Sequence, residues 1–274
     1  MVEVKDFQPA REMPETLVRV PGLITDGAFA EAVLRKYQEL AGSNANFRFN
    51  GRGSNVFITG LVNKVLEDSG FRVAVPTDRA YEEIFPLIKD KFYTDFNALD
   101  VRAKKPVRKE NVEIWNRVIE LAEQSLGRSP QFPFRVQGFY CVPDETKKGY
   151  EAGIEPAKNF RVIEDERLSL PTETKFKELD ENGMIVPSNK GFTLYALDNS
   201  VSRVCLSGGG YLGSDYVNLA DSYDTGRVAF VDAEGVASKF SVDKYSKQVL
   251  EAFKAKVKKA ESVRDGALSA LEKI

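Results

Sequence analysis

The stretch at 191–233, GFTLYALDNSVSRVCLSGGGYLGSDYVNLADSYDTGRVAFVDA, constrains the fold of this chain more than any other part of the sequence. It contains no Lys, Glu, Gln, Met or Trp, and small or polar residues separate its apolar ones. This pattern is typical of short antiparallel strands joined by turns, with one apolar side that packs inward. The apolar residues that would form this frame are Val201, Val204, Leu206, Leu212, Val217, Leu219 and Ala220.

Two explanations fit the restricted residue types of this stretch. A glycine-rich loop between strands is ordinarily poor in long side chains. Alternatively, the restriction follows from the genetic code: randomising both adenines of an Asn codon (A-A-pyrimidine) never produces Lys, Glu, Gln, Met, Trp or a stop codon. Every residue from Asn199 to Gly226 belongs to the set that such randomisation can reach. A fixed apolar frame with variable polar positions would diversify a binding face without loss of the fold.

Two segments resemble a known family. The run at 201–231 resembles the C-terminal variable region of proteins diversified by retroelements, in particular an archaeal or archaeal-virus group. Its end, GRVAFV at 226–231, resembles the final strand of the C-type-lectin fold in its formylglycine-generating-enzyme branch. Upstream, GFRVAVPTDRAYEE at 70–83 resembles the strand-to-helix segment of the same branch. The resemblance implies an α+β, C-type-lectin-like fold with an antiparallel, β-rich C-terminal part, and a variable ligand-binding region at about 199–226.

We expect the polar and small residues between the frame positions to lie exposed together on one face. Tyrosine gives a large contact area for few rotatable bonds, and small polar residues add hydrogen bonds, as in evolved binding surfaces. The expected ligand is a protein or another component of a cell surface. The positions expected to form this face, called here the variable-site positions, are Ser202, Cys205, Ser207, Gly209, Tyr211, Gly213, Asp215, Tyr216, Asn218, Asp221, Tyr223 and Asp224.

The chain contains no histidine, which excludes Ser–His–Asp and Cys–His nucleophile pairs and histidine-bound metals. Its two cysteines, Cys141 and Cys205, are predicted to be free thiols. Two thiols are too few to hold a soft metal, so we expect no catalytic metal and no cofactor. Enzymes of the resembled branch use a cysteine pair near the C-terminal end or histidine-bound iron, whereas this chain offers only Cys205 there. The resemblance therefore implies the fold but not the catalysis.

Other partners receive little support from the sequence. The net charge of -2 does not favour nucleic acid, and the two arginines of FRFNGRGSN at 47–55 form only a weak candidate site. No run of apolar residues is long enough to span a membrane, and the charged N-terminus does not resemble a secretory signal. GGGYLG at 208–213 fits G-x-G-x-x-G, but the residues after it are poor helix formers, which argues against a dinucleotide site. The compartment stays open between virion and cytoplasm.

The periodicity of the chain predicts a domain at 1–242 and a C-terminal helix at 243–274 that packs on the domain or on a partner in an assembly. Two alternatives to a binding protein stay open: an enzyme of the same fold, and a structural virion protein that uses the C-terminal helix. The predicted helices are 26–40, 55–69, 77–92, 110–126 and 173–179. The predicted strands are 17–20, 71–75, 132–142, 160–163, 185–186, 192–197, 201–206, 216–220 and 227–231, and the segment 236–242 is either a last strand or an extended lead into the C-terminal helix.

Overall fold

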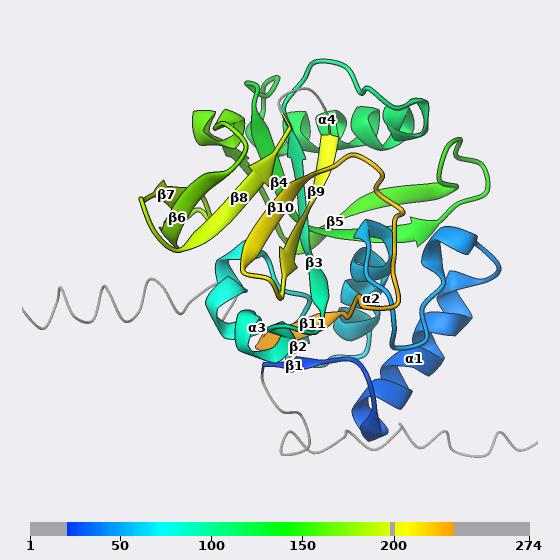
Figure 1. Cartoon of the computed structure of the whole chain (residues 1–274). Coiled ribbons are helices and arrows are strands. Elements are labelled where there is room, and N and C mark those ends of the chain that lie inside the picture. Colours follow the sequence, from blue (N-terminus) through cyan, green and yellow to red (C-terminus); the bar gives the residue numbers. More distant parts are fainter. Residues whose placement is uncertain (1–20, 198–200, 233–274) are drawn as a thin grey trace, which may run out of the picture.

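The computed structural model describes residues 21–197 and 201–232, which form an α+β fold whose strands are mostly antiparallel, as the sequence predicts (Figure 1). The helices are α1 (Gly27–Ala41), α2 (Val56–Asp68), α3 (Tyr81–Ile88) and α4 (Val112–Leu126). The first strands are β1 (Gly22–Leu23), β2 (Val73–Ala74), β3 (Tyr93–Val101), β4 (Phe134–Pro143), β5 (Ala152–Glu164) and β6 (Thr174–Leu179). The remaining strands are β7 (Ile185–Pro187), β8 (Phe192–Ala196), β9 (Val201–Ser207), β10 (Tyr211–Tyr216) and β11 (Ala229–Asp232).

The larger sheet has eight strands in the order β5-β4-β3-β9-β10-β8-β6-β7. All neighbours in it are antiparallel except β10 and β8, which run parallel. Strand β9 pairs with β3 on one side and with β10 on the other, so it lies inside the sheet. The stretch at 191–233 therefore supplies three interior strands of this sheet, β8, β9 and β10.

A smaller sheet has three strands in the order β1-β11-β2. Strand β11 pairs antiparallel with both neighbours, with Phe230 opposite Gly22 and Val231 opposite Ala74. In Figure 1 this sheet lies beside α3, and α4 lies at the opposite end of the molecule. The first and last strands of the described chain are thus hydrogen-bonded to each other.

Helix α2 anchors the largest of three hydrophobic clusters in the described residues, which it forms with α1, α4 and the strands β3 to β5. Asn55 caps it, because its side-chain oxygen accepts a hydrogen bond from the Ile58 N–H at 2.8 Å. At Gly60 the helix lies so close to β4 that an added Cβ would be 2.6 Å from the backbone nitrogen of Cys141. The second core packs α3 against residues of β6 and β8 to β10.

The sequence prediction is wrong for three elements. The strand predicted at 216–220 lies instead at Tyr211–Tyr216 (β10), and residues 217–220 are in the loop that follows it. The segment predicted as a helix at 173–179 is strand β6, in which a β-bulge between Phe176 and Glu178 places the buried Phe176 and Leu179 three residues apart. That spacing imitates one face of a helix. Strand β3 was not predicted at all, because buried polar residues such as Asp95, Asn97 and Asp100 interrupt its apolar pattern.

The predicted strands at 17–20 and 236–242, the predicted C-terminal helix at 243–274 and the domain boundary near 242 lie outside the described residues. Among the helices at 21–197 and 201–232, none combines the length and the apolar character that a membrane span requires.

Candidate functional site

Strands β9 and β10 form a hairpin whose apolar side chains point into the cores. In its register, Leu212 lies opposite Leu206, and Gly213 lies opposite Cys205. The exposed fraction of the side chain is at most 2% for Val201, Val204, Leu206, Leu212 and Leu219, while Val217 and Ala220 are half-buried. The apolar frame that the sequence predicts is therefore confirmed for its five most buried members.

The variable-site positions divide into three groups by exposure. Gly209, Tyr223 and Asp224 are exposed. Six more are half-buried: Ser207, Tyr211, Asp215, Tyr216, Asn218 and Asp221.

The exposure prediction is wrong for Ser202, Cys205 and Gly213, which are buried. The reason is that β9, which carries Ser202 and Cys205, and β10, which carries Gly213, are both interior strands whose faces are covered by packed side chains. An added Cβ at Gly213 would lie 2.9 Å from the Cys205 sulfur and 2.8 Å from the Tyr216 ring. Gly209, in contrast, makes only ordinary contacts, so this turn position has room for a side chain.

Ser202 belongs to a buried polar network and not to a surface. Its hydroxyl accepts a hydrogen bond from Arg102 Nη1 at 2.8 Å and donates one to the Ser214 carbonyl at 2.9 Å. Arg102 Nη2 in turn donates to Asp100 Oδ2 at 2.8 Å. Arg135 donates to both oxygens of the same carboxylate. Each of these groups has protein partners, so the network is part of the core.

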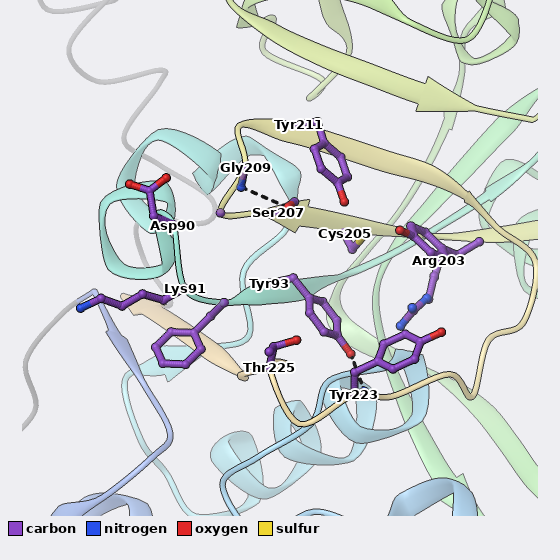
Figure 2. A pocket seen from close by; sticks show the side chains of 13 residues that line it. Asp90, Lys91, Tyr93, Arg203, Cys205, Ser207, Gly209, Tyr211, Tyr223 and Thr225 are labelled. Atoms are coloured by element: carbon purple, nitrogen blue, oxygen red, sulfur yellow. Dashed lines mark hydrogen bonds between the residues drawn. The ribbon is translucent and has the colours of Figure 1, made fainter.

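A cavity of about 460 Å³ opens beside the hairpin and is the candidate site (Figure 2). Half of the variable-site positions line it, together with residues from the start of β3 that the sequence did not single out. Its lining from the hairpin and the following loop is Arg203, Cys205, Ser207, Gly208, Gly209, Tyr211, Tyr216, Tyr223 and Thr225. Its lining from the segment before and at the start of β3 is Asp90, Lys91, Phe92 and Tyr93.

Arg203 forms the floor of this cavity, with 1% of the residue exposed. Its Nη1 donates to Asp95 Oδ2 at 3.1 Å and to the backbone carbonyls of Asp221 at 2.7 Å and Ser54 at 3.3 Å. Burial, the largest single effect, would lower the pKa of Arg203, but Asp95, Cys205 and Tyr93 together outweigh burial and hold the pKa above its usual range. One charged side chain therefore joins β9, β3, the start of α2 and the loop after β10.

Tyrosine rings surround this guanidinium. Its central carbon lies 4.9 Å from the centre of the Tyr216 ring and 5.9 Å from that of Tyr93, distances at which a cation and an aromatic face attract. The Tyr93 hydroxyl donates to the Ser54 carbonyl at 3.0 Å and accepts from the Tyr223 N–H at 2.9 Å. Figure 2 shows Tyr93, Cys205 and Tyr211 around the same space. The cavity thus has aromatic walls fixed by hydrogen bonds on a charged floor.

Sequence reasoning missed Tyr93 and Arg203 as site residues. Tyr93 begins a strand that the pattern did not predict. Arg203 lies within the predicted variable region, but nothing in the sequence pairs it with Asp95, 108 positions away. Only the pairing of β3 with β9 brings these residues together.

Both cysteines are free, as predicted, and both are buried. Burial, followed by the nearby charge of Asp95, raises the pKa of the Cys205 thiol to about 12. A thiol held so far from ionisation at neutral pH is a poor nucleophile. Within residues 21–197 and 201–232, no three His, Cys, Asp or Glu side chains gather in a way that could hold a metal ion.

A second cavity, of about 880 Å³, adjoins the first. Residues of the segment 37–55 form one wall, and Ala220, Ser222, Tyr223 and Asp224 form the other. Tyr223 lines both cavities. The loop after β10 is therefore the partition between two hollows on the surface.

No protein-family model, curated protein or solved structure matches this chain. The function is therefore argued from the geometry and chemistry of the two cavities.

Proposed function

We propose that this protein is a non-catalytic ligand-binding protein whose retroelement-diversified surface, at about 199–226, recognises a protein or another component of a cell surface. The observation that carries the proposal is the division of one hairpin and its following loop into two sets of residues. The frame positions Leu206, Leu212 and Leu219 are buried, while Tyr211, Tyr216 and other variable-site positions line one cavity. Substitutions at the second set would change the cavity wall and leave the core intact.

The chemistry of the cavity favours binding over catalysis. The chain has no histidine to act as a general base, and Cys205 is held as a neutral thiol. The lining instead combines tyrosines with serine and glycine, which is the composition of evolved binding surfaces. A volume of about 460 Å³ lies within the range of cavities that enclose a ligand group.

We further propose that the fold is C-type-lectin-like, of the formylglycine-generating-enzyme branch. The support is that the two segments of the resemblance, far apart in the sequence, form neighbouring strands. Strand β2 within 70–83 pairs with β11 at the end of 201–231, with Val73 opposite Asp232. After β2 the chain continues into a 3₁₀ turn, Asp78–Ala80, and then into α3, which is the strand-to-helix order that the resemblance implies.

The test is to sequence the gene and its neighbouring DNA from many members of one natural population. We expect a reverse transcriptase gene and a near-copy of codons 199–226 that differs at adenines. Substitutions should gather at the codons for Ser207, Gly209, Tyr211 and Tyr223 and should be missing from those for the frame residues. An invariant sequence with no near-copy would contradict the retroelement part of the proposal.

A further inference from the structure

We propose that the second cavity binds an acidic peptide segment of the same ligand, which would therefore be a protein. This inference rests on the proposed function and adds a ligand class to it. It assigns a role to the segment 44–53, which lies in a part of the chain far from the variable region.

The position of the second cavity is the first argument. The loop after β10 separates the second cavity from the first, which is the candidate site. Tyr223, with 58% of the residue exposed, lies at the boundary between them. A ligand that packs on Tyr223 would therefore reach both hollows. Hydrogen bonds hold the partition in place, because the Ser54 N–H donates to Ser222 Oγ at 3.0 Å and the Tyr223 N–H donates to Tyr93 Oη at 2.9 Å.

The charge of the second cavity is the next argument. Arg48 and Arg52 line it, both are exposed, and neither guanidinium makes a hydrogen bond or ion pair with the residues that the structure describes. The one acidic side chain of this lining is Asp224.

A third arginine, Arg227, lies near the second cavity. Burial lowers the pKa of Arg227, and the positive charge of Arg52 lowers it further, while Asp224 opposes both. Its Nη1 donates to the backbone carbonyl of Asp224 at 2.7 Å, so Arg227 is held beside the one acidic residue of the lining and offsets its charge. Positive charges that repel one another in this way attract an anion from solution.

The arginines and the neutral polar groups of the lining can both bind a peptide. Arginine binds carboxylates through two parallel hydrogen bonds, which a surface with Arg48 and Arg52 can offer to Asp or Glu side chains. The side-chain oxygen Oδ1 of Asn50 accepts a hydrogen bond from the Arg52 backbone N–H at 3.2 Å, which leaves the side-chain N–H groups of Asn50 for a ligand carbonyl. A nucleic acid would need a wider basic surface, and the chain as a whole carries a net charge of -2.

The experiment is a selection of random peptides displayed on phage against the immobilised full-length protein. Enriched peptides are synthesised and their binding is measured by fluorescence anisotropy with the unchanged protein and with two variants. The first variant, Arg48→Gln with Arg52→Gln, removes both charges from the cavity. The control variant, Arg35→Gln, removes an exposed charge from α1 outside both cavities.

We expect enriched peptides to carry Asp or Glu, and the double variant to bind them about tenfold more weakly while the control binds as before. Addition of salt should weaken binding to the unchanged protein more than binding to the double variant. Enrichment of peptides without acidic residues that depend on Tyr211 and Tyr223 would overturn the acidic-peptide inference and leave the proposed binding face standing. Failure to enrich any peptide, or binding that neither cavity affects, would overturn the inference as well. Charge-dependent binding of a sulfated oligosaccharide in place of the peptides would overturn its ligand class.

Discussion

Two buried arginine–aspartate clusters lie along the pairing of β3 with β9, and they differ in one respect. In the core cluster, Asp100 accepts hydrogen bonds from Arg102, Arg135 and Ser214, so its carboxylate is fully used. In the cavity cluster, Asp95 Oδ1 lies 3.0 Å from Arg203 Nη1 in an ion pair but accepts no hydrogen bond from the described residues. Arg203 Nε is buried without a hydrogen-bond partner among the described residues.

The two clusters differ in their capacity to bind a further group. A saturated network of buried polar groups stabilises one arrangement of the core and has no capacity to bind anything else. Unsatisfied polar groups cost free energy, and they are retained where a ligand or a water molecule completes them. The cavity cluster, on the floor of a hollow with tyrosine walls, is of the second kind.

The largest expected effect comes from removing the charge at the centre of the core cluster. Asp100→Asn should lower the free energy of unfolding by about 3–5 kcal/mol, because two buried guanidinium groups lose their shared carboxylate. The matched change in the cavity cluster, Asp95→Asn, should cost only about 1–3 kcal/mol, because Arg203 keeps two carbonyl acceptors and borders a cavity that admits water. Urea denaturation measures both. Equal losses of unfolding free energy in the two variants would contradict the distinction between the clusters.

The next effect concerns the frame of the hairpin. Leu212→Ala should cost roughly 2–5 kcal/mol, because the leucine is buried in the second core. Its sequence neighbour on β10, Tyr211, lines the cavity, and Tyr211→Ser should change stability by no more than about 0.5 kcal/mol. Thermal unfolding measures the stability of both variants. If Leu212→Ala were as stable as the unchanged protein, the apolar side of the hairpin would not be a fixed part of the core.

A smaller effect on stability is expected at the Tyr93 hydroxyl, which connects the loop after β10 to β3 by a hydrogen bond. Tyr93→Phe removes a donor to the Ser54 carbonyl and an acceptor for the Tyr223 N–H, at a cost of about 0.5–1.5 kcal/mol. The amide hydrogens of 219–226 should exchange faster in this variant. Tyr195→Phe on β8 is the matched control, and unchanged exchange in Tyr93→Phe would show that other contacts hold the loop.

The smallest expected effect concerns the alkylation of Cys205 in the folded protein. Alkylation requires the thiolate, and a pKa of about 12 leaves roughly one Cys205 thiol in ten thousand ionised at pH 8. Native protein treated with iodoacetamide at pH 8 should therefore stay unlabelled at Cys205, whereas protein unfolded in guanidinium chloride should react at both cysteines. The folded pKa is raised, so labelling should increase as the pH rises toward the pKa. Rapid labelling of the native protein at pH 7 would instead indicate an activated thiol and favour the enzyme alternative.

The sequence predicted the elements whose apolar residues follow one period, and it missed those whose patterns are interrupted. Helix α2 and strand β4 have long apolar runs, and both lie where periodicity predicts them. Strand β3 was not predicted, because Asp95 and Asp100 are buried through partners on strands that lie far away in the sequence. Strand β6 was mistaken for a helix because a bulge changes its period.

The candidate site could be predicted only as a list of positions. Residue types indicated which positions would suit a binding face, but the burial of Ser202 and Cys205 depends on β9 lying between β3 and β10, and that of Gly213 on β10 lying between β9 and β8. No local feature of the sequence encodes that position in the sheet. The floor residue Arg203 and the wall residue Tyr93 likewise become visible only once the strands are paired.

The division into a fixed frame and a changeable cavity wall is tested most directly by two matched libraries. One randomises Ser207, Gly209, Tyr211, Tyr216 and Tyr223 over the residues reachable from an Asn codon, and the other randomises Val201, Val204, Leu206, Leu212 and Leu219 in the same way. Resistance of the displayed proteins to protease measures the folded fraction of each library. We expect most members of the first library to stay folded and few of the second, because only the second removes buried side chains from the core. Equal folded fractions, or a larger loss in the first library, would contradict the account.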